Sequence, residues 1–230
     1  MANTLKKLVA LTGAGISAES GIKTFRDSGG LWEQYDVMEV ASIGGWRKNP
    51  QLMQRFYNER RKQLSEVEPN AAHRILAELE AYFDVTVVTQ NVDNLHERAQ
   101  SSKILHLHGE LTKARSCADS NWVLDIGYRP IEWGETAPDG SLLRPHIVWF
   151  GEAVPMIGAA SETVAEADIL VVVGTSLNVY PAAGLVAYAP RETPIYVVDP
   201  NDIVCPGRNV TSIREKATAG MEKLKKMLLE

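Results

Sequence analysis

The stretch Gly13-Ala14-Gly15-Ile16-Ser17-Ala18-Glu19-Ser20-Gly21 decides the fold of this chain, and it follows closely on the apolar run of residues 8–11. A buried strand that leads through a glycine turn into a helix start points main-chain N–H groups at one spot, which suits a diphosphate. Gly13-x-Gly15-x-x-Ala18 is the dinucleotide-binding fingerprint with alanine in its third position. The same sequence pattern also occurs in glycine turns that only allow a helix to pack closely on a strand. The motif therefore does not indicate dinucleotide binding without further evidence from the sequence.

The residues after this turn depart from an ordinary Rossmann dehydrogenase. That class places an acidic residue about 20 positions further on, at the end of a second strand, where it binds a ribose. Residues 30–36 include Glu33 and Asp36, but the next convincing apolar strand pattern comes only at residues 85–88. The sequence therefore predicts that a dinucleotide is held differently, beneath a long insertion able to close over it. A nicotinamide dehydrogenase is the least favoured class.

Composition excludes several other classes of protein. The 230 residues are 45% hydrophobic, which is enough for one large α/β domain. The net charge of −5 comes without a basic tail or stripe, so we expect no nucleic-acid partner. No apolar run reaches about 18 residues, and the run near the start is too short for a signal peptide. We therefore expect no membrane partner and a cytoplasmic location.

The cysteine count limits the metal chemistry. Cys117 and Cys205 are the two cysteines of the chain, and they are far apart in sequence. Two thiols cannot supply a four-cysteine zinc site, and a reducing compartment disfavours a disulfide. We therefore expect ordinary thiols.

Alternating strand and helix patterns predict the fold class. Strand patterns lie near residues 5–12, 84–89, 103–107, 146–150, 168–174, 194–199 and 209–213, and helix patterns near 50–64, 70–81, 91–99, 158–167, 181–189 and 214–229. This order predicts an α/β fold with a Rossmann-like parallel sheet and helices on both faces. One mostly helical and one polar insertion predict a smaller lobe. We expect one domain over residues 1–230, with a large lobe at about 1–27, 84–109 and 144–230 and a small lobe at about 28–83 and 110–143.

Polar residues follow several predicted strands, at the edge where open parallel sheets bind ligands. Gln90, Asn91 and Asp93 follow the strand pattern that ends at residue 89, although turns and helix caps favour the same residue types. Two later strand patterns end in Gly174-Thr175-Ser176 and Asp199-Pro200-Asn201. These segments suit phosphate and ribose, or simple turns.

Two histidines lie on one face of a predicted strand, because His106 and His108 alternate with apolar residues. A histidine at a strand end before glycine suits a general base, since its ordinary pKa is near 6.5. A structural role is commoner for a lone histidine. Metal binding by the pair is a further possibility but lacks a matching carboxylate motif.

Six segments in a fixed order carry a family resemblance. They are Gly-Ala-Gly-Ile-Ser at residues 13–17, Gly21-Ile22 with Phe25-Arg26-Asp27, Thr89-Gln90-Asn91-Val92-Asp93, His108-Gly109, Phe150-Gly151-Glu152 and Gly174-Thr175-Ser176. This order resembles that of the sirtuins, the NAD-dependent protein-lysine deacylases, over about residues 8–229. Within that family the chain looks most like the bacterial CobB type, on segments such as Gly30-Leu31-Trp32-Glu33 and Asn94-Leu95-His96-Glu97-Arg98.

The resemblance implies a role for each matching position. It implies His108 as general base, with Asn91 and Asp93 as further catalytic residues in a nicotinamide pocket. It implies that an acyl-lysine protein or peptide pairs as a strand with Val148, Phe150, Gly151, Glu152, Val179 and Tyr180. It implies NAD as co-substrate, held by Gly13, Ala14, Gly15, Ser17, Ala18, Glu19, Ile22, Phe25, Arg26, Trp32, Gln90, Asn91, Asp93, Gly174, Thr175, Ser176, Asn201 and Ala217.

The implied reaction transfers an acyl group from lysine to ADP-ribose. The acyl oxygen attacks C1′ of the nicotinamide ribose, nicotinamide leaves, and His108 takes a proton from the ribose hydroxyls. Water then releases free lysine and 2′-O-acyl-ADP-ribose. A non-catalytic NAD or ADP-ribose sensor and a mono-ADP-ribosyltransferase remain as alternatives, although the presence of His108, Asn91 and Asp93 speaks against a sensor.

Tyr57 and Arg60 indicate the acyl group. They are three apart on a predicted helix and so share a face. In the acidic-acyl branch of the family this pair lies in the acyl pocket, where a guanidinium and a phenol suit a terminal carboxylate. Ala41 would leave room for a longer chain. The resemblance thus implies succinyl- and malonyl-lysine as best substrates, with acetyl-lysine accepted. The alternative is a solvated Arg60 and a packing Tyr57.

The polar insertion departs from the family pattern. Sirtuins usually carry two Cys-x-x-Cys pairs between the catalytic histidine and the Phe-Gly-Glu segment, whereas this chain has only Cys117 there. We therefore expect a degenerate zinc-module remnant without bound zinc. Its own packing would hold it together, through Trp122, Leu124, Ile126, Tyr128, Ile131 and Trp133.

Overall fold

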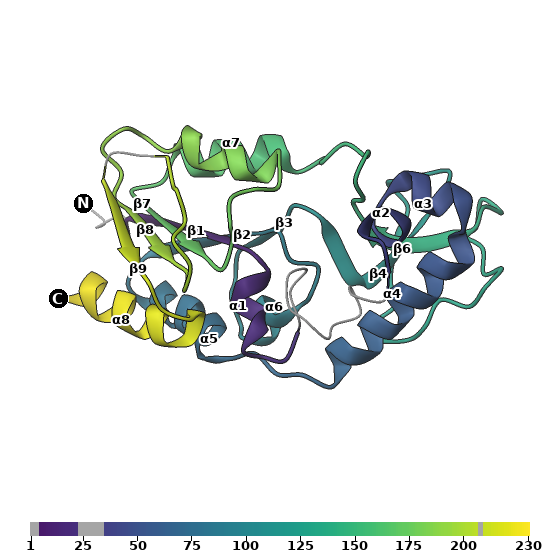
Figure 1. Ribbon diagram of the computed structural model, residues 1–230, viewed down its shortest axis with the longest axis horizontal. Helices are drawn as coiled ribbons and strands as arrows, with labels where there is room; N and C mark the ends of the chain where they lie inside the picture. The colour runs from purple at the N-terminus through teal and green to yellow at the C-terminus, as the bar shows by residue number, and fades with distance from the viewer. Residues whose placement is uncertain (1–4, 23–34, 207–208) are drawn as a thin grey trace.

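The large lobe is built on a parallel six-stranded sheet. The computed structural model describes residues 5–22, 35–206 and 209–230. The strands run in the order β3-β2-β1-β7-β8-β9, and every neighbouring pair is parallel. The predicted α/β fold class is confirmed (Figure 1). The strand bounds are β1 (Lys7–Thr12), β2 (Asp84–Thr89), β3 (Ile104–His106), β7 (Ile169–Val173), β8 (Ile195–Val198) and β9 (Val210–Ile213).

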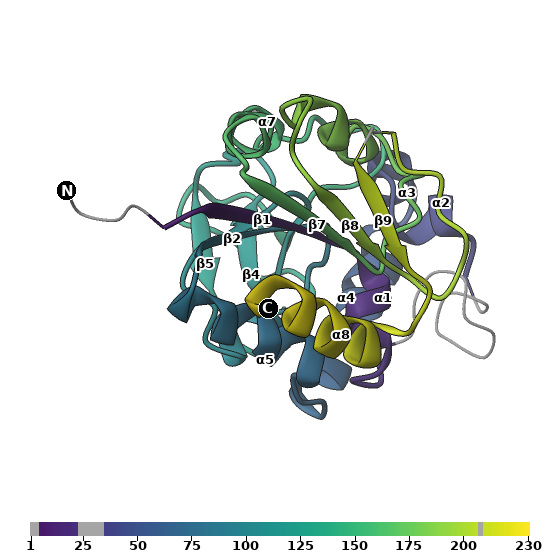
Figure 2. The ribbon, with the colours of Figure 1, turned by 90° about the vertical axis from the view of Figure 1, so that its left-hand side faces the viewer.

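Helices cover both faces of this sheet (Figure 2). Successive side chains of a strand point to opposite faces, so each strand that is buried on both sides is apolar throughout. Leu8 and Ala10 pack toward α5 (Ala71–Glu78) and α8 (Ala217–Leu229), whereas Val9 and Leu11 pack toward α7 (Ile157–Ala165) and the 3-10 helix η3 (Ala182–Tyr188). The short helix α1 (Ala14–Ala18) begins directly after the first glycine turn.

The small lobe combines a second sheet with a helical insertion. Strands β5 (Val123–Asp125), β4 (Gly109–Ser116) and β6 (Leu143–Ile147) form an antiparallel sheet in that order. Phe56, Tyr57, Leu111 and Trp149 belong to the apolar cluster between the helices and this sheet. The helices are α2 (Val37–Val40), α3 (Ile43–Lys48) and α4 (Pro50–Ser65), and α4 begins at Pro50 behind an Asn49 cap.

Several predicted element boundaries differ from the structure. The helix predicted at 91–99 is α6 (Leu95–Arg98), because residues 90–94 form a loop. The pattern at 70–81 forms α5 and the 3-10 helix η2 (Leu79–Ala81), and both pack on the six-stranded sheet and not in the small lobe. The strand predicted at 146–150 is β6, which lies in the second sheet.

The polar insertion contains β5 and most of β4, which the sequence did not predict as strands. Of the six side chains expected to hold it together, Ile126 and Ile131 are buried and Trp122 packs against them. The expectation was wrong for Leu124, Tyr128 and Trp133, which are exposed, because Ala114, Ala137 and Leu143 complete the cluster instead. In the described part of the chain, every helix is too short or too polar to cross a bilayer.

Candidate functional site

A cavity of about 940 Å³ opens at the carboxyl ends of β1, β2, β7 and β8 and extends to the small lobe. The sheet order changes direction at β1, which has β2 on one side and β7 on the other, and ligands of open parallel sheets bind at such a point. Every site residue predicted from the sequence lines this cavity, except Phe25, Arg26 and Trp32, which lie outside the described residues.

Two glycine turns meet at the floor of the cavity. The Gly15 N–H donates to the Gly174 carbonyl at 2.8 Å, and the Gly13 N–H donates to the Val173 carbonyl at 3.0 Å. A Cβ on Gly15 would lie 2.6 Å from Gly174 Cα, and Gly174 has φ +61°. Glycine is therefore required at both positions. We call the main-chain surface that these turns give to the cavity at the start of α1 the glycine cradle.

A buried polar network stands behind that cradle. The Asn91 side-chain amide donates to the Gly13 carbonyl at 3.2 Å and to the Ser17 hydroxyl at 3.1 Å. The Ser17 hydroxyl donates to an Asp93 carboxylate oxygen at 2.9 Å. Burial raises the pKa of Asp93, although hydrogen bonds from Leu95 and Ser17 oppose the shift. The network fixes the orientation of Asn91 and Asp93 before any ligand binds.

His108 lies in the cavity wall with one ring nitrogen already committed. Its Nδ1 is 2.9 Å from the Gln90 carbonyl, which is an acceptor, so Nδ1 carries the proton. In the neutral ring Nε2 then keeps its lone pair. Burial lowers the pKa of His108, partly offset by the Gln90 hydrogen bond. The ring is therefore neutral at pH 7 and can accept a proton.

Tyr57 and Arg60 form the opposite end of the cavity, together with Ala41. Tyr57 is 3% exposed, and burial raises its pKa to about 12, so it stays a phenol. Its hydroxyl accepts the Trp149 indole N–H at 2.9 Å, which leaves its own proton available to a ligand. Burial lowers the pKa of Arg60, while Tyr57 and Asp93 oppose that shift. The predicted pair thus faces the cavity and does not lie on the solvated surface.

Part of the main chain of the predicted peptide-binding segment is already paired. The Val148 N–H donates to the His108 carbonyl, and the Phe150 N–H donates to the Ala41 carbonyl at 2.8 Å. The Phe150 carbonyl accepts from Ile43. These main-chain groups are already paired within the chain, so a substrate strand has to use other groups of the cavity wall, which also includes Gly151, Val179 and Tyr180.

The side chain of Glu152, which is one of the residues predicted to contact the peptide, is bound within the protein. Its carboxylate accepts hydrogen bonds from Arg144 at 2.7 and 2.9 Å, from Arg115 at 3.2 Å and from the Trp149 N–H at 2.9 Å. Burial opposes its ionisation, but these hydrogen bonds and the two guanidinium charges lower its pKa overall. Through these hydrogen bonds its side chain stabilises the cavity wall.

Two predicted cofactor residues have structural partners as well. The Glu19 carboxylate accepts the Thr218 N–H and hydroxyl at the start of α8, each at 2.9 Å. The Asn201 amide donates to Asp199 at 2.9 Å. Ala217, predicted near the adenine, lies in the cavity wall at the first residue of α8.

Sequence reasoning missed part of the lining. Trp149 could have been found, because it directly precedes Phe150-Gly151-Glu152 and carries a buried indole N–H that needs an acceptor. Lys216 and Ile203 carried no comparable signal. The residues missed are Val92, Ile147, Trp149, Val154, Pro181, Val198, Ile203 and Lys216.

One group of possible metal ligands occurs in the described part of the chain. Atoms of Glu97, His106 and Glu110 lie within 4.8 Å of one another, so His106, unlike His108, does have carboxylates beside it. His106 already contacts Glu97 at 2.6 Å, and Glu110 contacts Lys113 at 2.7 Å. These groups satisfy one another as ion pairs.

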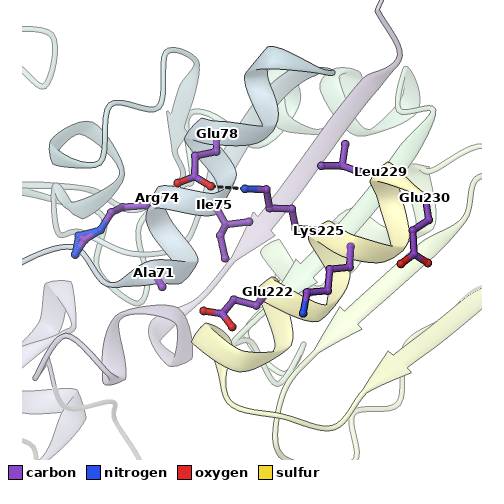
Figure 3. A pocket seen from close by; sticks show the side chains of 9 residues that line it. Ala71, Arg74, Ile75, Glu78, Glu222, Lys225, Leu229 and Glu230 are labelled. Atoms are coloured by element: carbon purple, nitrogen blue, oxygen red, sulfur yellow. Dashed lines mark hydrogen bonds and ion pairs between the residues drawn. The ribbon is translucent and has the colours of Figure 1, made fainter.

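A second pocket, of about 550 Å³, lies between α5 and α8 (Figure 3). Its lining includes Arg74, Ile75 and Leu229, and the Lys225–Glu78 ion pair of 2.6 Å crosses it. Surface ion pairs of this kind contribute little to stability. The pocket shares no residue with the cavity that contains His108.

The sheet order and the paired glycine turns define an α/β protein of the dinucleotide-binding class. The sequence profile described as Sir2 family matches residues 13–181. The NAD-dependent protein deacylase of Bacteroides thetaiotaomicron is 54% identical over 233 residues, which cover 98% of this chain and 99% of that protein. One from Helicobacter pylori is 54% identical over 232 residues, with the same coverage.

Solved structures agree with these sequence matches. A mutant Sir2 homologue in complex with ADP-ribose has a TM-score of 0.88 and 37% identity, covering 98% of this chain and 92% of that one. A Sir2 homologue in complex with NAD has a TM-score of 0.87 and 37% identity, covering 98% and 90%. This chain belongs to the Sir2 family.

Proposed function

We propose that this chain is an NAD-dependent protein-lysine deacylase that removes succinyl and malonyl groups as well as acetyl groups, and that it is of the bacterial CobB type. One observation carries the proposal. The glycine cradle, His108 and the Tyr57–Arg60 pair line one continuous cavity. A dinucleotide at the cradle and an acyl chain beside Arg60 would therefore meet near His108.

The residues of the cavity support NAD as co-substrate. Gly13, Gly15 and Gly174 line the cavity without side chains, so a pyrophosphate could approach the main chain there. Asn91 and Asp93 are held in place from behind by Ser17, so a nicotinamide amide would meet preoriented acceptor oxygens. Bound NAD would supply the ribose carbon that receives the acyl oxygen.

His108 is proposed as the general base. Its neutral Nε2 faces a cavity large enough for both substrates, and its Nδ1–H is fixed by the Gln90 carbonyl. Gln90 itself donates through its amide to the Thr175 hydroxyl at 3.0 Å, which ties the base to the end of β7. A ribose hydroxyl near Nε2 would lose its proton there at neutral pH.

Arg60 and Tyr57 are proposed to bind the carboxylate of an acidic acyl group. A guanidinium and a phenolic proton together make charge-assisted hydrogen bonds to a carboxylate. Burial lowers the pKa of Arg60, and the carboxylate of an acidic acyl group would favour the charged guanidinium. An acetyl group has no such carboxylate but would still fit, since Ala41 leaves space.

The test is a comparison of rates on acetyl-, malonyl- and succinyl-lysine versions of one peptide. We expect NAD-dependent loss of all three groups, with kcat/KM at least about tenfold higher for the acidic ones. Higher kcat/KM for acetyl-lysine would contradict the acidic-acyl part. An unchanged peptide in NAD, with the protein still stabilised by NAD, would indicate the sensor alternative. A mass gain on protein would indicate ADP-ribosyl transfer.

A further inference from the structure

Two histidines hold two consecutive carbonyls of the loop that follows β2. His108 Nδ1 is 2.9 Å from the Gln90 carbonyl, and His106 Nδ1 is 3.1 Å from the Asn91 carbonyl. The Asn91 N–H is also fixed, because it donates to the Thr89 hydroxyl at 3.0 Å. The main chain of Asn91 is therefore held at both ends, while its side chain lines the cavity.

His106 differs from His108 in the partner of its second ring nitrogen, Nε2. Its Nε2 is 2.6 Å from the Glu97 carboxylate on α6, and its side chain is 9% exposed. Both ring nitrogens thus face an acceptor, and only the imidazolium has a proton for each. Burial alone would lower the pKa of His106, but the hydrogen bond and charge of Glu97 raise it above its ordinary value.

We propose that Glu97 and His106 form a positioning pair for the NAD site, in which Glu97 keeps His106 doubly protonated so that its Nδ1–H holds the Asn91 carbonyl. His106 does not line the cavity, so it acts through Asn91 and not on a substrate. The inference rests on the proposed function only in assigning Asn91 to bound NAD.

The other charged groups near His106 fit this arrangement. Glu110 on β4 adds negative charge but is paired with Lys113 at 2.7 Å. Asp93 lies close enough to the pair for the His106 charge to lower its pKa and for the Glu97 charge to raise it, so the two effects oppose each other. His96 is buried against Thr12, and burial and the charges of His73 and His106 keep its pKa well below the ordinary value.

The Glu97–His106 pair would make NAD binding depend on pH in the alkaline range. When His106 loses one proton, the remaining proton goes to the stronger acceptor, the Glu97 carboxylate. The Nδ1 lone pair then faces the Asn91 carbonyl, which is repulsive. We therefore expect the KM for NAD to rise as the pH increases through the raised pKa of His106, while kcat changes less.

Three variants test the inference. Glu97→Gln removes the carboxylate, and its amide can donate to Nε2 of the neutral ring, so Nδ1–H stays on Asn91. We expect this variant to lack the alkaline rise in KM for NAD. His106→Leu removes the donor, and we expect its KM for NAD to be about tenfold higher at every pH. Glu110→Gln is the matched control, because it removes a nearby negative charge but no hydrogen bond to His106, and we expect the alkaline rise to remain.

Two readouts separate this inference from the proposed function. NMR titration of the NAD-free protein should give His106 a pKa above about 6.5, which falls in Glu97→Gln. An unshifted His106 pKa in the wild type overturns the pair even if the protein binds no NAD. If the wild type turns over NAD and the profiles of wild type and Glu97→Gln superimpose, the positioning role is wrong while the deacylase proposal stands. Thermal unfolding checks that each variant is folded.

Discussion

The two ends of the cavity are built in different ways. At the sheet edge, main-chain atoms of two glycine turns form the surface, and the Gly15–Gly174 hydrogen bond sets its shape. At the small lobe, side chains from distant segments form the surface, as in the 2.9 Å contact between Trp149 and Tyr57, which are 92 positions apart. A main-chain surface suits a constant ligand, and a side-chain surface can be tuned to one acyl group.

This difference predicts two kinds of variant. Substitutions of His108, the proposed base between the two ends of the cavity, should affect every acyl substrate equally. Changes at the small lobe should separate acidic from neutral acyl groups.

The largest effect is expected for His108→Ala. Loss of a general base lowers rates by about 10²- to 10⁴-fold, and we expect this for acetyl- and succinyl-lysine alike. Mass spectrometry of the peptides measures the loss. NAD should still raise the unfolding temperature of the variant, because the glycine cradle is intact. Full activity would remove the base assignment.

Arg60→Met should lower kcat/KM for succinyl-lysine by about ten- to a hundredfold, because a charge-assisted hydrogen bond is lost. Acetyl-lysine turnover should change by less than about threefold, since the acetyl group makes no such bond. Arg55→Met is a matched control on an exposed position of α4. Equal losses on both substrates would make Arg60 a structural residue only.

The pH profile of kcat/KM for the peptide should show an acid limb. Burial lowers the pKa of His108 below its ordinary value of about 6.5, and the base works only when neutral. Activity should therefore be flat from about pH 7 to 8 and fall about tenfold per pH unit below the pKa. An acid limb centred above pH 7 would contradict a neutral buried His108.

Trp149→Phe should have a smaller and selective effect. It keeps the ring beneath Arg144, whose guanidinium lies 3.5 Å from the ring centroid, but removes the N–H that orients the Tyr57 hydroxyl. We expect succinyl-lysine kcat/KM to fall about fivefold, the value of one neutral hydrogen bond. Acetyl-lysine serves as the internal control. A loss on both substrates would show that Trp149 acts through packing.

The smallest effect is expected for metal removal. The polar insertion is held by the apolar cluster of Ala114, Ile126, Ile131, Ala137 and Leu143, so a chelator should leave the unfolding temperature unchanged. Metal analysis of the purified protein gives the complementary measurement. A marked fall in unfolding temperature on adding EDTA would contradict a zinc-free insertion.

The sequence predicted the sheet edge better than the small lobe for a physical reason. The signals for Gly13, Gly15 and Gly174 are local, because a strand, a turn and a helix start follow one another in the chain. The second sheet has no such signal, since β4 and β6 pair across more than 25 residues and carry charged side chains. Long-range pairing and side-chain networks depend on tertiary packing.

The partners of the Glu152 side chain show the same limit at one residue. The place of Glu152 beside Phe150 and Gly151 predicts a main-chain contact with the peptide but does not indicate that Arg144 and Arg115 bind its carboxylate. Neither arginine is next to Glu152 in the sequence, and no sequence motif links either of them to it. Tyr57 and Arg60, by contrast, were singled out by the resemblance to the acidic-acyl branch, and both line the cavity, as residues three apart on one helix face can.

Product analysis of a succinyl-lysine peptide incubated with the protein and NAD tests the central claim most directly. That claim is that one cavity brings an acyl chain held by Arg60 to an NAD molecule held at the glycine cradle. The account predicts equal amounts of free-lysine peptide, nicotinamide and succinyl-ADP-ribose. An unmodified peptide, or succinate released without NAD consumption, would contradict it.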